Sequence, residues 1–161
     1  MTIDDDITNI LKEEGPPTND PIDKGGRTKY GISEKSHPEF WANGQDGPTE
    51  AQARTLYAQK YVRGPGFDKI LDPSLQAQLI DYGVNSGPMV AIQKLQAILK
   101  VPVDGVLGLN TLSTITRVDP KWLNNQLVGA RVLMFAKLVT NVPSQSKFLI
   151  GWITRAISFL V

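Results

Sequence analysis

The chain has 161 residues, of which 41% are hydrophobic and 20% are charged, a composition typical of one compact soluble domain. It contains no cysteine, which excludes thiol nucleophiles, thiolate zinc sites and a disulfide framework. The single histidine, His37, argues against a hydrolytic zinc site and lies beside Pro38 in a polar stretch typical of a surface loop. A net charge of +1 is too small to indicate a nucleic-acid partner.

The N-terminal sequence, MTIDDD, lacks the basic start and the apolar stretch of a secretory signal. We therefore expect synthesis in a cytoplasm, without a signal peptide. A run of about 18 apolar residues, the length that a transmembrane helix needs, does not occur.

The first predicted helix spans residues 3–14, where Ile7, Ile10 and Leu11 recur at helical spacing. Three aspartates near its start suit the positive end of the helix dipole, and a Gly-Pro-Pro run ends it. Residues 15–48 are dense in Gly, Pro, Asn and Asp, which predicts turns and a small β excursion with one short strand around 28–32.

The remaining sequence predicts a helical body. Thr49 can cap a helix through about residue 61, Pro73 opens another through about 82, and Ser86 begins a third. A loop over 103–108 precedes a short helix near 110–116. Asp119 and Pro120 start a helix whose apolar content over 122–139 predicts that it is long and largely buried.

The last stretch, residues 144–161, places Gly151, Thr154, Arg155 and Ser158 on one stripe of an otherwise apolar helix. Arg155 is the only charge on that stripe. It could face solvent, pair with an acid such as Glu14 or Asp81, or point at a substrate. The same helix could touch a membrane, but its wide apolar arc and few basic residues favour core packing.

Of the adjacent acids Glu13 and Glu14, the second lies on the apolar face of the first predicted helix. Burial and the negative end of the helix dipole both disfavour a charged carboxyl, so the pKa of Glu14 should rise. A carboxyl that stays protonated can donate a proton, as one of the two carboxyls of a glycosidase does. The alternative is a frayed last turn in which Glu14 reaches water.

The chain continues with Glu14-Gly15, with Asn19-Asp20-Pro21 and with the run DKGGRTKYGIS over residues 23–33. These motifs resemble the opening of the glycoside hydrolase family 108 muramidases, a branch of the lysozyme superfamily. In phage lysozymes of that superfamily, a helix-ending Glu is followed by an Asp nine residues on and by a Thr about fifteen on. Asp23 and Thr28 stand at similar spacings in this chain.

The resemblance implies three catalytic residues: Glu14 as general acid, Asp23 as the carboxylate that orients water or stabilises positive charge, and Thr28 as the hydroxyl that positions that water. Asp20 is the alternative to Asp23, because Asn-Asp-Pro is also a common turn element. The family usually continues after the Glu with a second glycine and an aromatic residue. This chain instead has Pro16-Pro17, which puts the floor of the cleft in doubt.

Further blocks extend the resemblance to the C-terminus and look like the peptidoglycan-binding region that accompanies these enzymes. They cover residues 81–88, 95–96 and 104–112, and Gly151-Trp152 with Arg155. Four residues are candidate sugar contacts, each with a structural alternative: Tyr30, Trp41, Tyr82 and Asn85. The loop at 104–111 is more typical of a turn and helix cap than of a ligand site, and capping is expected of Ser86.

The resemblance implies a mainly α, lysozyme-like fold with a small β-hairpin region near residues 18–35. We expect one domain over 1–161, with the catalytic helix and β region in 1–68 and a helical, peptidoglycan-binding-like lobe in 69–161 packed against it.

The implied activity is that of an endolysin-type or secretion-associated N-acetylmuramidase that cleaves the bond from N-acetylmuramic acid to N-acetylglucosamine, with inversion favoured. A lytic transglycosylase and a non-catalytic wall-binding module are the alternatives. We expect no metal, no cofactor and no nucleic-acid partner. We also expect a monomer whose release to the periplasm or cell wall depends on a holin.

Overall fold

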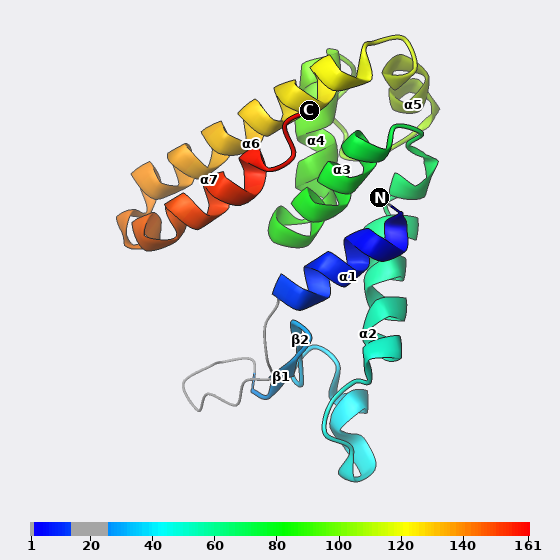
Figure 1. Ribbon diagram of the computed structural model, residues 1–161, viewed down its shortest axis with the longest axis vertical. Coiled ribbons are helices and arrows are strands. Elements are labelled where there is room, and N and C mark those ends of the chain that lie inside the picture. The colour runs from blue at the N-terminus through cyan, green and yellow to red at the C-terminus, as the bar shows by residue number, and fades with distance from the viewer. Residues whose placement is uncertain (1, 14–25) are drawn as a thin grey trace. The chain divides into compact units, whose positions relative to one another are not determined.

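The computed structural model describes residues 2–13 and 26–161. The chain divides into two compact units, 1–63 and 64–161. The mainly helical class with a small antiparallel hairpin, predicted from the sequence, is confirmed (Figure 1). No helix of the described residues is both long and apolar enough to cross a bilayer.

The first unit begins with α1 (Ile3–Glu13), which buries Ile7, Ile10 and Leu11 as its spacing predicts. The single strand predicted around 28–32 is instead a hairpin of β1 (Thr28–Lys29) and β2 (Ile32–Ser33). The predicted strand is divided in two because Tyr30 and Gly31, the residues between β1 and β2, both have positive φ (52° and 71°), the geometry of a tight reversing turn. The small β-hairpin expected near residues 18–35 is thus present.

The rest of the first unit is helical. The 3-10 segment η1 (Pro38–Gly44) precedes α2 (Glu50–Tyr57), which continues as the π-helical segment η2 (Ala58–Arg63). Thr49 caps α2 as predicted: its hydroxyl accepts from the backbone N–H of Gln52, and the Gln52 side chain accepts in return from the backbone N–H of Thr49.

The second unit opens with the short η3 (Phe67–Lys69) and then α3 (Pro73–Ser86), which packs against α4 (Pro88–Leu99) and α6 (Pro120–Asn141). The predicted start at Pro73 is correct. The predicted start of the next helix at Ser86 is wrong, because α3 runs on to Ser86 and Gly87, with φ 90°, joins it to α4. Gly87 provides no side-chain cap, so the capping expected of Ser86 does not occur.

The C-terminal elements are α5 (Leu109–Ile115), then α6, η4 (Pro143–Phe148) and α7 (Leu149–Ile157). Asp119 caps α6 by accepting from the backbone N–H of Trp122 at 2.6 Å. The length of α6 agrees with its prediction but the burial does not, because Trp122 and Leu133 on this helix are exposed.

Candidate functional site

The predicted catalytic site begins where α1 ends. Glu14 directly follows the last residue of α1, but Glu14, Asp20 and Asp23 lie outside the described residues. The structure does describe the apolar face on which the helical spacing places Glu14: Ile7 and Ile10 are buried in the first unit.

The hairpin carries the third predicted catalytic residue, Thr28. Thr28 pairs across the sheet with Ser33, and Lys29 pairs with Ile32. Because neighbouring strand residues point to opposite faces and Ile32 is buried, Thr28 lies on the face turned away from that core contact. Thr28 is half-buried, and its hydroxyl lies 3.5 Å from the backbone carbonyl oxygen of Gly26, so its role in positioning water stays a prediction.

Hydrogen bonds at its base and at its turn hold this hairpin. The Arg27 guanidinium donates two hydrogen bonds to the Glu34 carboxylate, from Nε at 3.0 Å and from Nη2 at 2.8 Å. These bonds hold the pKa of Glu34 below its ordinary value and raise the pKa of Arg27. At the turn, the hydroxyl of Tyr57, the last residue of α2, donates to the backbone carbonyl of Tyr30 at 3.0 Å. The hairpin is thus closed at its base and anchored to α2 at its turn.

Two predicted sugar contacts fall on the first unit. Tyr30 is half-buried at the turn, so a sugar contact there stays a prediction. Trp41 is buried in η1, and its ring lies so close to Gly47 that a Cβ on that glycine would stand 3.0 Å from the ring and 3.1 Å from the carbon stem of Lys29. A stacking role for Trp41 does not agree with that burial, because its ring belongs to the core.

The other two predicted sugar contacts fall on α3. The Tyr82 side chain is fully buried and its hydroxyl donates to the sulfur of Met134 at 3.2 Å, so the aromatic alternative, core packing, describes it. Asn85 is exposed, and its amide donates to the backbone carbonyl of Asp81 at 2.9 Å. Backbone bonding is therefore the alternative that the structure shows for Asn85, and a sugar contact through its amide oxygen stays a prediction.

A buried charge network surrounds Asp81. Its carboxylate accepts from Arg131 Nη2 at 2.5 Å and from Arg155 Nε at 2.7 Å. The pairing with Asp81, one of the alternatives open for Arg155, is what the structure shows. Arg131 is completely buried among aromatic rings, with the centre of the Tyr82 ring 5.1 Å from its guanidinium carbon. This network ties α3, α6 and α7 together.

Gln96 on α4 organises the loop at 104–111, a function that the sequence did not reveal. Its amide nitrogen donates to Asp104 Oδ1, to the Val106 carbonyl and to Thr111 Oγ1, and its oxygen accepts from the Gly105 N–H. A glutamine on the buried side of an apolar helix was the available signal. The loop is a turn, as predicted, but Gly108 precedes α5 without providing a side-chain cap.

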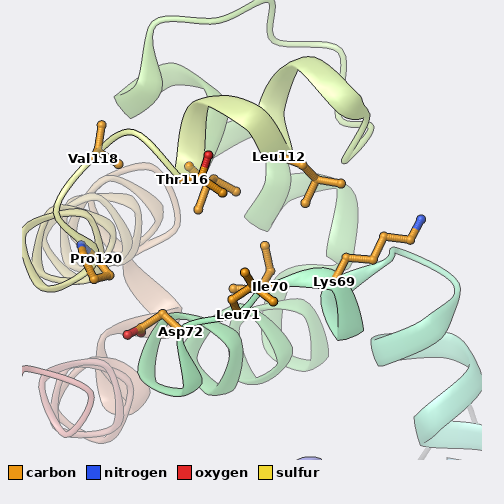
Figure 2. Close-up of a pocket in the computed structure, with 9 residues that line it drawn as sticks. Lys69, Ile70, Leu71, Asp72, Leu112, Thr116, Val118 and Pro120 are labelled. Carbon is orange, nitrogen blue, oxygen red and sulfur yellow. The ribbon is translucent and has the colours of Figure 1, made fainter.

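A pocket of about 370 Å³ lies in the second unit between α5 and the loop preceding α3 (Figure 2). Its lining is largely apolar and includes Ile70, Leu71, Leu112 and Ile115, with Lys69 and Asp72 also contributing. None of the predicted site residues that the structure describes lines this pocket. In residues 2–13 and 26–161, no group of three His, Cys, Asp or Glu side chains could hold a metal ion.

Comparisons with known proteins agree with this architecture. A family model described as glycosyl hydrolase 108 matches residues 7–87, and one described as a predicted peptidoglycan domain matches residues 90–157. The solved structure of SagA from Brucella abortus has a TM-score of 0.75 and 24% identity, over 96% of this chain and 89% of that one. At that identity the likeness shows the fold alone, which is consistent with the lysozyme-like class. A search of curated proteins finds no match.

Proposed function

Because the chain belongs to the glycosyl hydrolase 108 family, we propose that it is an N-acetylmuramidase, which hydrolyses the β-1,4 bond between N-acetylmuramic acid and N-acetylglucosamine. In its coarser form the activity follows from the family matches: the chain is a glycoside hydrolase that acts on peptidoglycan. One observation carries the finer proposal. The family match spans most of α1, the chain positions of Glu14 and Asp23, and the hairpin that bears Thr28.

The proposed reaction divides the proton transfers between two carboxyl groups. Glu14 gives its proton to the glycosidic oxygen as the bond from that oxygen to the anomeric carbon breaks. A water molecule adds its oxygen to the anomeric carbon and passes a proton to Asp23, while the Thr28 hydroxyl positions that water. The support for Thr28 is its place on the outward face of the hairpin, and its precise setting depends on the Arg27–Glu34 and Tyr57–Tyr30 contacts.

The decisive variant is Glu14→Gln, which removes the acid and preserves the shape of the side chain. We expect the rate of lysis of purified walls, followed by turbidity, to fall at least about 100-fold, because a general acid contributes roughly that much or more. Glu13→Gln is the matched control, since Glu13 is the adjacent carboxyl at the exposed end of α1, and it should retain lysis. Full activity of Glu14→Gln would contradict the assignment.

Mass spectrometry of the products identifies the bond and the reaction type. A muramidase leaves N-acetylmuramic acid at the new reducing end and adds one water per cut. Products that end in N-acetylglucosamine would assign the other glycosidic bond, and anhydro products would assign a lytic transglycosylase that uses Glu14 alone. NMR of fresh products should show an inverted anomeric configuration, because water attacks directly from the Asp23 side.

We propose an endolysin-type setting for this activity, in which a monomer made in the host cytoplasm reaches the wall through a holin. Co-expression in a bacterial host tests this setting. Lysis should require both the active chain and a holin, and lysis by the chain alone at the same expression level would contradict holin dependence.

A further inference from the structure

The end of the helical hairpin formed by α6 and α7 exposes a cluster of apolar side chains. The two helices lie side by side and η4 connects them (Figure 1). We call the following residues the hairpin tip: Leu138, Val142, Phe148 and Ile150, with exposed fractions of 39%, 41%, 45% and 81%, and the exposed Lys137 and Lys147. Exposed apolar side chains grouped at one end of a helical hairpin are typical of an interaction surface.

A stack of aromatic rings holds the tip in place. The Phe148 ring lies 5.6 Å from the Trp152 ring, which lies 5.3 Å from the ring of Phe135. Phe135 is buried in the core of the second unit. One side of the Phe148 ring is therefore held by contact with Trp152, which in turn contacts the buried Phe135, and the rest of the ring is exposed.

The charged side chains of α6, η4 and α7 are all basic. From Pro120 to Val161 the sequence has no acidic residue and five basic ones. Two of these, Arg131 and Arg155, are paired with Asp81 in the core. Lys137 and Lys147 remain on the surface of the tip, with the Lys147 ammonium 4.8 Å from the centre of the Phe148 ring. Apolar surface and positive charge thus coincide.

We propose that the hairpin tip docks on the surface of an anionic phospholipid bilayer. Such a surface accepts both features, because acyl chains cover the apolar side chains while anionic headgroups pair with the lysines. A second copy of the same tip fits less well, since it would bring Lys137 and Lys147 against their own counterparts. The contact is with the surface, because no described helix can span a bilayer.

Vesicle sedimentation with the full chain tests the docking. The protein should sediment with vesicles of phosphatidylglycerol and phosphatidylcholine more than with vesicles of phosphatidylcholine alone, and added salt should weaken the difference. The double variant Phe148→Ser/Ile150→Ser should lower the partition coefficient at least about tenfold, since burial of each side chain contributes strongly. The control is Leu109→Ser, at an 87% exposed leucine of α5, which should bind as the parent does.

Removing the positive charge of the two tip lysines tests the electrostatic contribution to docking. Lys137→Gln/Lys147→Gln should reduce partitioning about fivefold for each lysine. Lys94→Gln/Lys100→Gln, which makes the same charge change on α4 and its end, should leave partitioning nearly unchanged. Lys137, Lys147 and Ile150 are exposed, so their replacement should leave thermal unfolding unchanged. Phe148→Ser also removes the ring that stacks on Trp152, so the single variant Ile150→Ser tests docking without that loss of packing.

Three outcomes would overturn the proposal: equal binding to both kinds of vesicle, no binding to anionic vesicles at low salt, or equal losses in tip and control variants. Sedimentation equilibrium covers the rival occupant. A dimer that Ile150→Ser abolishes would assign the tip to a second copy of the chain and so also overturn membrane docking. None of these measurements depends on which glycosidic bond the enzyme cleaves.

Discussion

Asp81 balances two arginines in the core of the second unit, and one of them has no other ionic partner among the described residues. Arg131 is fully buried, and its Nε and Nη1 atoms make no hydrogen bond to any residue of the described ranges. The rings of Tyr82, Phe135 and Phe159 lie 5.1 to 5.8 Å from its guanidinium carbon. Aromatic faces partly replace the missing hydrogen bonds, but Asp81 is the carboxylate that neutralises the buried positive charge of Arg131.

We therefore expect Asp81→Ala to lower the free energy of unfolding by about 3–5 kcal/mol, the cost of leaving one buried charge without its partner. Arg155→Gln should cost much less, because that side chain is partly exposed and Arg131 keeps Asp81. Urea denaturation followed by circular dichroism measures both. Equal losses in the two variants would show that Arg131 does not depend on Asp81 in this way.

The ion pair at the base of the hairpin gives a prediction about pH. Hydrogen bonds from Arg27 lower the pKa of Glu34, so Arg27→Gln should return that pKa toward its ordinary value. The pair's contribution to stability is present above the unfolded pKa of Glu34 and is lost as the pH falls through the lowered folded pKa. The difference in stability between parent and variant should accordingly vanish in acid.

NMR titration of the Glu34 carboxyl carbon measures this shift. Arg54→Gln is the control, because Arg54 pairs with Asp4 and Glu50 instead and should not move the titration of Glu34. An unchanged Glu34 titration in Arg27→Gln would show that the hydrogen bonds from Arg27 do not lower this pKa.

Among the elements, α2 holds the turn of the hairpin through a hydrogen bond from Tyr57. Tyr57→Phe deletes the hydroxyl that binds the Tyr30 carbonyl and should destabilise the protein by about 1 kcal/mol. If the hairpin positions Thr28 for catalysis, the rate of wall lysis should fall by more than the folded fraction does. Tyr61→Phe, on the neighbouring ring 5.3 Å away, should have a smaller effect on lysis. Equal lysis rates in the two variants would count against a positioning role.

The starts of the helices could be predicted because their signals are local. Thr49 and Asp119 each cap a backbone N–H three residues ahead, so the determining atoms are close in sequence. The junction at Gly87 could not be read in this way, because Asn85 and Ser86 are typical of a helix start although they are the last two residues of α3. Its positive φ replaces the side-chain cap that the sequence suggested at Ser86.

Burial and pairing were harder to predict, because both depend on what packs against an element. The apolar content of α6 suggested a largely buried helix, yet Leu133 is exposed, since composition does not say which side meets a neighbour. The sequence left several possible partners for Arg155, one of which was Asp81. The packing of α7 on α6 and of α6 on α3 brings Arg155 and Asp81 together. The roles of Glu14 and Asp23 stay predictions.

In the whole molecule, the family boundary and the structural boundary differ. The hydrolase model ends at residue 87, whereas the compact units meet between residues 63 and 64. Consequently α3 belongs to the hydrolase family match but packs against α4 and α6, which the peptidoglycan-domain model covers. The hydrolase match therefore does not correspond to a self-sufficient domain.

A truncated chain of residues 1–89 should accordingly fail to fold cooperatively, because it leaves the buried face of α3, including Leu75, Leu79 and Tyr82, without partners. Residues 64–161 keep that core and should unfold in one cooperative transition. Thermal melts by circular dichroism, with gel filtration for aggregation, compare the two fragments. A monomeric fragment 1–89 with a sharp melt would contradict this dependence of α3.

The amide of Gln96 fixes the loop that precedes α5 from outside that loop, through its bonds to Asp104, Gly105, Val106 and Thr111. The loop's conformation thus depends on a side chain of α4, while the side chains of Val103 and Val106 are exposed. Substitutions at those two exposed positions should therefore change stability little. Gly105 should be costly to replace, since its φ of 75° favours glycine and a methyl group there would stand 2.6 Å from the Met89 side chain of α4, the helix that precedes the loop.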